Sequence, residues 1–183
     1  MKLDWVRVEP TEIIPVGKYR TMVRKNFILP DGSRREFVTK EVEGASSQAV
    51  LAITPDSKVV LAKQFRPGPE KIMYEIPGGG REPGETSEQA AVRELREETG
   101  YTAGRVEWLG TIHKDAYTNS IHQYYIAYNC TKSSDGQQLD STEFIEAVEV
   151  SVDELFRLAK SASMTDTEVL FLAYDKLLSL KEG

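Results

Sequence analysis

Residues 79–101 read GGREPGETSEQAAVRELREETGY and hold the most constrained pattern in the chain. The first six of these residues include three glycines and a proline, which predict a loop. Thr86 with Gln89 forms a capping signal for a helix, and Ser87 is an alternative start. Gly100 is the expected C-terminal stop of that helix. This stretch therefore predicts a loop that leads directly into one helix.

Helical spacing separates a core side of this segment from an acidic side. Three residues fall on the side suited to the core: Val92, Leu95 and Thr99. Glu94 and Glu98 lie one turn apart on a neighbouring face, with Glu97 beside them. Glutamates at this spacing repel each other, and a bound cation would reverse that repulsion. Oxygen-rich clusters without imidazole suit Mg²⁺ or Mn²⁺. The alternative is a solvated charged face, with Arg93 and Glu97 as an ordinary ion pair.

The full spacing resembles the Nudix box, G-x5-E-x7-R-E-U-x-E-E-x-G-U, in which U is a bulky apolar residue. The matching residues are Gly79, Glu85, Arg93, Glu94, Leu95, Glu97, Glu98, Gly100 and Tyr101. Only Tyr101 fits its class loosely. Nine constrained positions in twenty-three form a specific signal. A broader resemblance, to the ADP-ribose and nucleoside-diphosphate-sugar pyrophosphatase branch, covers most of the chain.

This resemblance implies an α/β fold, with a mixed β-sheet sandwiched between helices and an N-terminal β-hairpin extension. It also implies metal-dependent hydrolysis of the diphosphate bond of ADP-ribose or a related nucleoside diphosphate sugar. The products would be a nucleoside monophosphate and a sugar phosphate. Mg²⁺ is the implied cofactor, and Mn²⁺ could replace it. The alternatives are a nucleoside triphosphate pyrophosphatase and a non-catalytic regulator that binds nucleotide sugars.

The resemblance also assigns roles to residues of the box. Glu94 and Glu98 would bind the divalent ions, Glu97 would assist, and Gly78 would lend its backbone carbonyl. Many members of the branch have alanine at the position of Gly78. Arg93 counts among the catalytic residues, and we expect it to orient neighbouring carboxylates. We expect Glu85 to support the metal ligands, although an acid near a helix N-terminus is also favoured by the helix dipole.

Substrate contacts and the catalytic base are expected outside the box. Arg66 ends a predicted strand and resembles the arginine that contacts the substrate diphosphate in this branch; a guanidinium suits that geometry. Glu75 would lie on the substrate side, although strand alternation also allows it to point to solvent. Glu143, in the TEFIE segment, matches the general base of the branch, and Glu146 is the second candidate. A solvent-facing acid at a strand edge is the alternative for both glutamates.

Length and composition predict one soluble domain with a small appendage. The chain has 183 residues, of which 40% are hydrophobic and 28% are charged. A net charge of −6 argues against nonspecific binding of nucleic acid or of anionic membranes. The first ten residues lack the apolar segment of a signal peptide, and no apolar run reaches the length of a membrane span. Cys130 is the single cysteine, which excludes an intrachain disulfide and fits the reducing cytoplasm.

Two parts are predicted along the chain, an N-terminal β extension over 1–45 and a Nudix hydrolase domain over 46–183. PDGS at 30–33 predicts the turn of a hairpin within the extension. Related pyrophosphatases use such an extension to form a homodimer. Three of its aromatic residues could bury at that interface or stack on a base: Trp5, Tyr19 and Phe37.

The remaining segments predict strands followed by helices. The predicted strands cover 49–55, 58–66, 105–114, 121–130 and a last strand marked by Phe144, Ala147, Val148 and Val150. Ser151 with Glu154 forms a capping box for a helix over 151–160. Thr165 with Glu168 predicts another for a helix over 167–180. The branch often carries a proline about fifteen residues past the box, whereas this chain has none at 115–117. This departure weakens the assignment to ADP-ribose itself.

Overall fold

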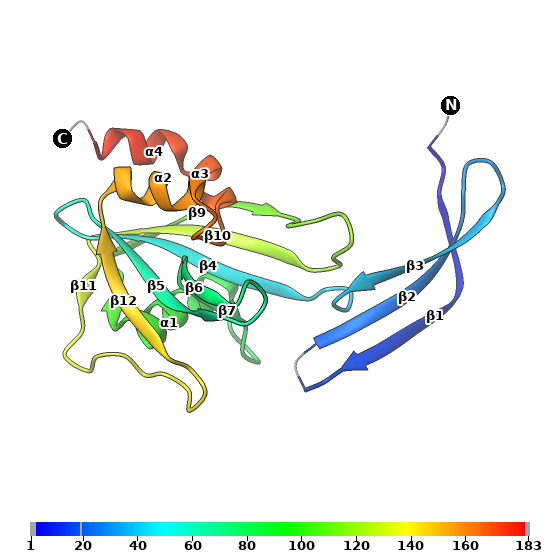
Figure 1. The fold of residues 1–183 in the computed structure, drawn as a ribbon, viewed down its shortest axis with the longest axis horizontal. Coiled ribbons are helices and arrows are strands. Elements are labelled where there is room, and N and C mark those ends of the chain that lie inside the picture. The colour runs from blue at the N-terminus through cyan, green and yellow to red at the C-terminus, as the bar shows by residue number, and fades with distance from the viewer. Residues whose placement is uncertain (1–2, 19, 182–183) are drawn as a thin grey trace. The chain divides into compact units, whose positions relative to one another are not determined.

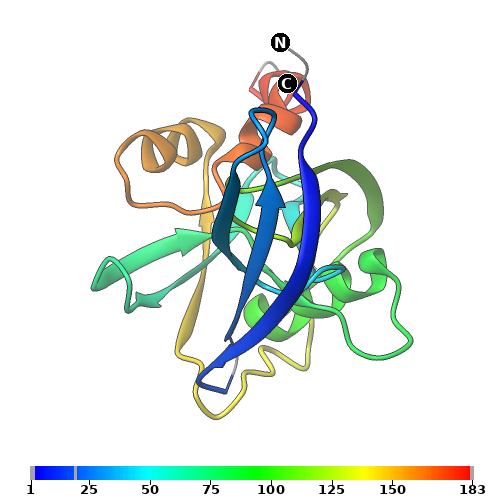
Figure 2. The same cartoon turned by 90° about the vertical axis from the view of Figure 1, so that its right-hand side faces the viewer.

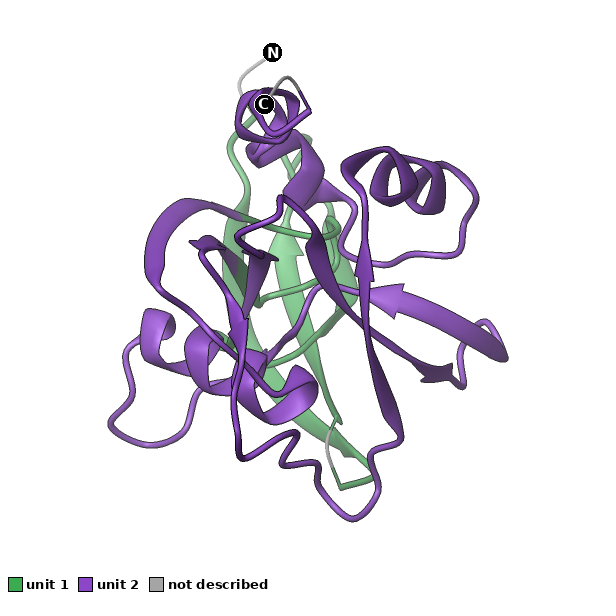
Figure 3. Cartoon of the chain, turned by 90° about the vertical axis from the view of Figure 1, so that its left-hand side faces the viewer, with its two compact units in different colours: residues 1–46, 112–122 green, residues 47–111, 123–183 purple. Residues whose placement is uncertain are grey.

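The computed structural model describes residues 3–18 and 20–181 and divides the chain into two compact units (Figure 3). Unit 1 comprises residues 1–46 and 112–122, and unit 2 comprises residues 47–111 and 123–183. Residues 112–122 of unit 1 include the connection between the two strands predicted over 105–114 and 121–130. The two units are described separately below.

Unit 1 is built on a three-stranded antiparallel sheet, seen side by side in Figure 2. Its strands are β1 (Val6–Val16), β2 (Arg20–Ile28) and β3 (Arg34–Lys40). The predicted hairpin is confirmed, because Ile28 pairs with Arg34 across the turn that contains Gly32 at φ +81°. That backbone conformation is one that glycine adopts without strain. Strand β1 adds a third strand to the hairpin.

Aromatic side chains gather within unit 1. Trp5, Phe27 and Phe37 form three ring contacts, with centroids 5.9 to 6.3 Å apart in edge-on or tilted orientations. Such geometry is favourable for aromatic pairs. Trp5 remains 49% exposed. Tyr19 lies outside the described residues.

Unit 2 contains most of a seven-stranded sheet in the order β12-β5-β4-β10-β9, with β6 paired to β5 and β7 paired to β4. The strands are β4 (Ser46–Ile53), β5 (Val59–Arg66), β6 (Lys71–Glu75), β7 (Gly78–Gly80), β9 (Arg105–Ile112), β10 (Ile121–Tyr128) and β12 (Ile145–Val150). A separate short pair joins β8 (Tyr101–Thr102) to β11 (Thr131–Lys132). The predicted central strands, β4 and β5, are confirmed.

Helices cover both faces of this sheet (Figure 1). Helix α1 (Ser87–Thr99) lies on one side, and α2 (Val152–Lys160), α3 (Glu168–Leu172) and α4 (Tyr174–Ser179) lie on the other. The predicted sandwich of helices around a β-sheet is therefore confirmed. Large apolar and aromatic side chains of the sheet and of the helices are fully buried. They are Leu51, Leu61, Tyr124 and Ile126 from the strands and Leu95, Leu155 and Leu177 from the helices. None of the helices in the described part of the chain is both long and apolar enough to span a membrane.

The C-terminal helices differ from the prediction. The single helix expected over 167–180 is two short helices, α3 and α4, separated at Ala173. The capping box of Thr165 does not form, because its hydroxyl instead donates to the Asp166 carboxylate at 2.8 Å. Asp166 itself has φ +55°, so the chain cannot enter a helix there. Val169, Ala173 and Leu177 nevertheless share a buried apolar face along this segment.

Two further predictions hold only in part. The Ser151 hydroxyl caps α2 by accepting the Glu154 backbone N–H at 3.1 Å. The Glu154 carboxylate pairs with Arg157 rather than returning to the cap, so the box is half formed. Phe144 precedes β12 and is 83% exposed, so it does not mark a buried strand position.

Candidate active site

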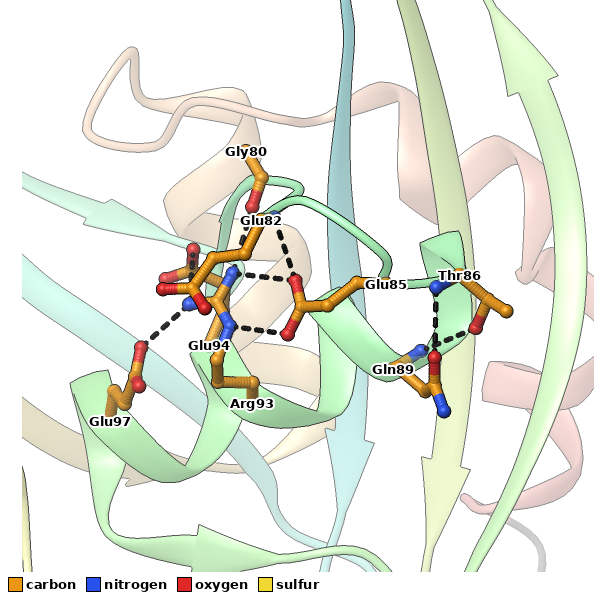
Figure 4. A network of polar contacts seen from close by, with 8 residues as sticks. All are labelled: Gly80, Glu82, Glu85, Thr86, Gln89, Arg93, Glu94 and Glu97. Atoms are coloured by element: carbon orange, nitrogen blue, oxygen red, sulfur yellow. Dashed lines mark hydrogen bonds and ion pairs between the residues drawn. The ribbon is translucent and has the colours of Figure 1, made fainter.

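Helix α1 begins and ends where the sequence predicts. Thr86 is the N-cap: its hydroxyl accepts the Gln89 backbone N–H at 3.2 Å, and the Gln89 side chain accepts the Thr86 N–H at 2.9 Å (Figure 4). Gly100 ends the helix at φ +74° and donates its N–H to the Arg96 carbonyl. The reciprocal cap fixes the first turn of the helix that carries the acidic residues.

The buried face of α1 includes an acid. Ala91, Leu95 and Thr99 are buried as the core stripe, whereas Val92, predicted to be in the core, is only half-buried. Compared with the prediction, α1 is turned about its own axis. Ala91 therefore occupies the core position expected for Val92, and the Glu98 side chain points into the protein. Glu98 is 7% exposed, so the alternative of a solvated acidic face is wrong for this residue. A buried carboxylate requires compensating contacts.

Arg93 links three carboxylates and one carbonyl (Figure 4). Its Nε donates to Glu85 at 2.8 Å, and its Nη1 donates to Glu97 at 2.7 Å and to Glu94 at 3.0 Å. Its Nη2 donates to the Gly80 carbonyl at 2.9 Å. These hydrogen bonds, with the one to Glu85 as the largest cause, raise the pKa of Arg93. The guanidinium thus fixes the orientation of the acids.

Glu98 has an environment that disfavours its negative charge. Burial raises the pKa of Glu98 to about 8, opposed by a hydrogen bond from the Gly78 backbone N–H at 2.9 Å. Like charges raise the pKa further, and they come from Glu94, Glu143 and Glu75. These carboxylates therefore lie near enough to Glu98 to act on it, although with Glu98 they come from three different segments of the chain: α1, β6 and the loop before β12.

Two glycines near these acids allow other groups to pack directly against the backbone. A Cβ on Gly79 would overlap the Glu94 carboxylate, so glycine is what lets Glu94 lie against this backbone. A Cβ on Gly78 would overlap the backbone of Gln48 and Ala49 in strand β4. The alanine expected at the position of Gly78 in related enzymes would therefore not fit here without a shift of the strand.

Arg66 and Glu75 form a bidentate ion pair. Arg66 Nε donates to Glu75 Oε1 at 2.7 Å, and its Nη2 donates to Oε2. Gln64 also donates to this carboxylate, at 3.2 Å. Glu75 is 6% exposed, so the alternative in which it points to solvent is wrong. Neighbouring strands explain the pairing, because Ala62 and Glu75 are register partners on β5 and β6, and Arg66 shares the face of Ala62.

The two candidate bases have different surroundings. Glu143 is half-buried, and its carboxylate accepts the Asp140 backbone N–H at 3.0 Å. Glu146 pairs with Lys63 at 2.6 Å, and its side chain is 65% exposed. Glu143 also raises the pKa of Glu94 and Glu98, after burial as the largest cause. The charge of Glu143 thus acts on the acidic cluster, whereas Glu146 is paired with Lys63 at an exposed strand position.

The donors around Glu98 suit a hard divalent cation, because they are carboxylates and backbone carbonyls. The burial of the Glu98 side chain and the close contact of the Glu94 carboxylate with Gly79 support this fit. Within residues 3–18 and 20–181, no three acidic, histidine or cysteine side chains already converge as a metal site. Arg93 contacts Glu94 and Glu97 and supplies positive charge there.

The sequence reasoning did not identify Gln137, which connects two parts of the site. Its side-chain amide donates to the Glu98 carbonyl at 2.6 Å and to the Ile145 carbonyl at 3.1 Å. It therefore ties the end of α1 to the start of β12. A lone glutamine in a polar loop gives no sequence signal for contacts with residues as far as 39 positions away.

Comparison with known proteins agrees with this geometry. The family model described as the NUDIX domain matches residues 45–171, which is more than half of the chain. The chain belongs to the Nudix family. It is a Nudix hydrolase, and the box residues described above are the signature of this family within the chain.

Two relatives are similar to nearly the whole chain. The chain is 32% identical to an ADP-ribose pyrophosphatase of Bacillus subtilis, over 91% of this chain and 89% of the relative. It is 33% identical to a methanol dehydrogenase activator of Bacillus methanolicus, over 94% of this chain and 92% of the relative. A crystal structure of an ADP compounds hydrolase shares the fold, with a TM-score of 0.82 and 20% identity, over 98% of this chain and 97% of the other.

Proposed function

We propose that this Nudix hydrolase cleaves the diphosphate bond of ADP-ribose or a related nucleoside diphosphate sugar. Water adds to one phosphorus atom, the bridging P–O bond breaks, and a nucleoside monophosphate and a sugar phosphate leave. The similarity to an ADP-ribose pyrophosphatase over most of both chains supports this substrate class. The observation that carries the proposal is the buried Glu98 carboxylate, which lies among acids from three segments of the chain.

The proposed cofactor is Mg²⁺, which Mn²⁺ could replace. Glu94 and Glu98 would hold the ion, with Glu97 assisting and the Gly78 carbonyl as a further donor. When bound, such an ion neutralises charge on the diphosphate and lowers the pKa of a coordinated water. Arg93 acts as a positioning group, because its hydrogen bonds hold Glu94 and Glu97 in place.

Arg66 is the proposed contact for the diphosphate. The pair with Glu75 uses Nε and Nη2 of the guanidinium. Among the contacts of the described residues, none uses Nη1, and this nitrogen is left to donate to a phosphate oxygen. Glu75 therefore orients Arg66 and does not need to touch the substrate itself. A guanidinium held in this way suits a phosphate because it offers fixed donors.

Glu143 is the proposed general base. Its carboxylate lies within the electrostatic reach of Glu98, and among the described residues its hydrogen-bond donor is the Asp140 backbone N–H of the same loop. Glu146 is less suited because Lys63 already neutralises it at an exposed strand position. Proton removal from water by a carboxylate requires that the carboxylate be free to approach that water.

Two alternatives remain from the sequence. A nucleoside triphosphate pyrophosphatase would use the same acidic cluster on a different substrate. A regulatory role has one specific observation in its favour, the similarity to a protein named as a methanol dehydrogenase activator. The full set of box acids supports catalysis. We also propose a cytoplasmic homodimer, in keeping with the lone, buried Cys130 and the exposed aromatic and aliphatic side chains of unit 1.

A substrate panel tests the proposed function. The wild-type protein is incubated with Mg²⁺ and ADP-ribose, ADP-glucose, GDP-mannose, NAD⁺ or nucleoside triphosphates, and products are separated by chromatography. We expect the monophosphate and the sugar phosphate from at least one diphosphate sugar. Hydrolysis of triphosphates alone would transfer the assignment to the first alternative, and binding without turnover would transfer it to the second.

Glu98→Gln tests the proposed metal role in the same assay. We expect turnover to fall by roughly 10²-fold or more, because the variant removes a charged ligand while keeping the side-chain shape. Glu88→Gln, an exposed acid on the same helix, is the matched control and should keep wild-type rates. Near wild-type turnover of Glu98→Gln at saturating Mg²⁺ would show that the ligand assignment is wrong.

A further inference from the structure

Large apolar side chains are exposed around the end of strand β5. Phe65 on β5 is 55% exposed, and its register partner Ile72 on β6 is 50% exposed. Phe144, just before β12, is 83% exposed. A hollow of about 510 Å³ is bordered by Phe144, Ile72, Leu139 and neighbouring residues of β5. Three exposed apolar side chains near one another are unusual unless another group covers them.

The register of β12 against β5 predicts where Phe144 and Glu143 would lie if β12 were two residues longer. The ladder pairs Ile145 with Gln64 and Glu146 with Lys63. Continued by two residues, the same antiparallel ladder places Phe144 opposite Phe65 and Glu143 opposite Arg66. These two pairs are not present in the structure, where β12 begins at Ile145.

In such an extended strand, the side chains of Phe144 and Glu143 would point to opposite faces of the sheet. Residues paired across a ladder share a face, and successive residues alternate between faces. An extended β12 would therefore put Phe144 on the face of Phe65 and Ile72. The same extension would put Glu143 on the face of Arg66, whose side chain pairs with Glu75. One change in the strand would bury the phenylalanine and turn the glutamate toward the site.

In the structure, the loop holds Glu143 away from that arrangement. The Glu143 carboxylate accepts the Asp140 N–H at 3.0 Å, and the Glu143 N–H donates to the Asp140 carbonyl at 2.9 Å. Both bonds lie within one turn of loop at the surface, where they are readily exchanged for others. Gln137 holds the Ile145 carbonyl, and the Gln138 backbone N–H donates to the Glu97 carbonyl at 2.9 Å. The start of β12 and residue 138 are thus fixed on either side of residues 139–144, the segment that would rearrange.

We propose that Phe144 is a positioning residue for the proposed base, Glu143. When a nucleoside diphosphate compound binds, β12 extends along β5, Phe144 packs on Phe65 and Ile72, and Glu143 turns toward Arg66. The contact of Phe144 with Phe65 is a cross-strand aromatic pair, which stabilises antiparallel strands. Phe144 does not touch the reacting atoms. This inference rests on the proposed function for the identity of the ligand.

Kinetics of matched phenylalanine variants provide the first test. We expect Phe144→Ala to lower kcat roughly 10- to 100-fold with little change in KM, because a misplaced base slows the chemical step. Phe144→Leu should recover most of the rate, since leucine can also pack on Phe65. Phe171→Ala is the matched control, because Phe171 is 84% exposed on α3 and belongs to no strand. Equal kcat for the Phe144→Ala and Phe171→Ala variants would overturn the proposal.

Coupling to the base gives a readout that a purely structural role would not affect. In a Glu143→Gln background, Phe144→Ala should have almost no further effect on kcat, since the group that it positions is already inactive. Independent, multiplicative losses would overturn the proposal. Light scattering of Phe144→Ala should equal that of the wild type. A loss of dimer in this variant would assign Phe144 to a contact between copies and would equally overturn it.

Hydrogen exchange separates this inference from the proposed function. The wild-type protein is compared with and without α,β-methylene ADP-ribose and Mg²⁺. We expect slower exchange of the backbone amides of residues 143–145 in the complex, and no slowing in the Phe144→Ala variant. Slower exchange in a protein that hydrolyses no nucleotide sugar would support the strand extension and overturn the proposed function. Hydrolysis without slower exchange would overturn the strand extension alone. If neither hydrolysis nor slower exchange were observed, both the proposed function and the strand extension would be overturned.

Discussion

At the scale of single residues, two acids only three positions apart have different chemistry because they contact different partners. The Glu146 carboxylate lies 2.6 Å from the Lys63 ammonium group and is largely exposed. The Glu143 carboxylate accepts a hydrogen bond from the backbone N–H of Asp140 in its own loop, and its charge acts on Glu94 and Glu98. A base must approach its water, so the carboxylate with the weaker attachment is the better candidate.

We therefore predict opposite outcomes for two matched variants. Glu143→Gln should lower kcat by roughly 10²–10⁴-fold while leaving substrate and Mg²⁺ binding nearly unchanged, which is the usual effect of losing a general base. Glu146→Gln should change kcat little, since it removes a surface ion pair. Steady-state rates at saturating substrate and metal measure both. If Glu146→Gln were the inactive variant and Glu143→Gln near normal, Glu146 would become the base.

The sequence predicted much of the site at this scale because box spacing is local. Arg93, Glu94 and Glu97 lie within two helical turns, so helical geometry alone brings them together. The pair of Arg66 with Glu75 depends on the register of two strands, which sequence patterns do not specify. The burial of Glu98 likewise depends on the rotation of α1 about its axis against the sheet. The same rotation leaves Val92, which was predicted to face the core, only half-buried.

At the scale of elements, the cap of α1 links the acidic cluster to local stability. Thr86 and Gln89 satisfy each other's backbone N–H groups at the start of the helix. Glu85, the residue before this cap, accepts two hydrogen bonds from Arg93. The first turn therefore holds both the helix and the loop residues that orient Arg93.

Thr86→Ala should lower the free energy of unfolding by about 1 kcal/mol, the typical cost of losing such a cap. Thr86→Ser should recover most of that loss, because serine supplies the same hydroxyl. Thermal or urea unfolding followed by circular dichroism measures the difference. Unfolding free energies that agree within error for the alanine variant and the wild type would show that the cap contributes nothing to stability.

The elements themselves were predicted where local signals agree with tertiary packing. Helix α1 has a cap, an apolar stripe and a terminal glycine, and each signal is used in the structure. The signals of the C-terminal segment conflict with its packing. Thr165 bonds to Asp166 instead of capping a helix, and the following residues form two short helices rather than one. Capping pairs such as Thr165 with Glu168 also occur by chance, and only tertiary structure shows which of them form.

At the scale of the whole molecule, unit 1 carries several large apolar side chains that are exposed to solvent. Its exposed apolar side chains include Leu3, Trp5, Val6, Ile13, Val16, Val38 and Val42. The ring contacts of Trp5 with Phe27 and Phe37 make one rigid aromatic cluster within this unit. Small isolated sheets are only marginally stable, and apolar side chains gathered on a surface often mark an interface.

We therefore predict a homodimer at micromolar concentration whose contact uses unit 1. Trp5→Ala should weaken the dimer by roughly 30-fold, because a tryptophan in the centre of an interface typically contributes about 2 kcal/mol or more. Trp108→Ala is the matched control, since Trp108 is 61% exposed on β9 in unit 2. Light scattering across a concentration series, with hydrolysis of ADP-ribose measured on the same samples, compares the three proteins. If dimer contacts help to complete the substrate pocket, activity of the Trp5→Ala variant should fall on dilution together with its mass. A wild-type protein that is monomeric at micromolar concentration and hydrolyses ADP-ribose at full rate would contradict this assembly.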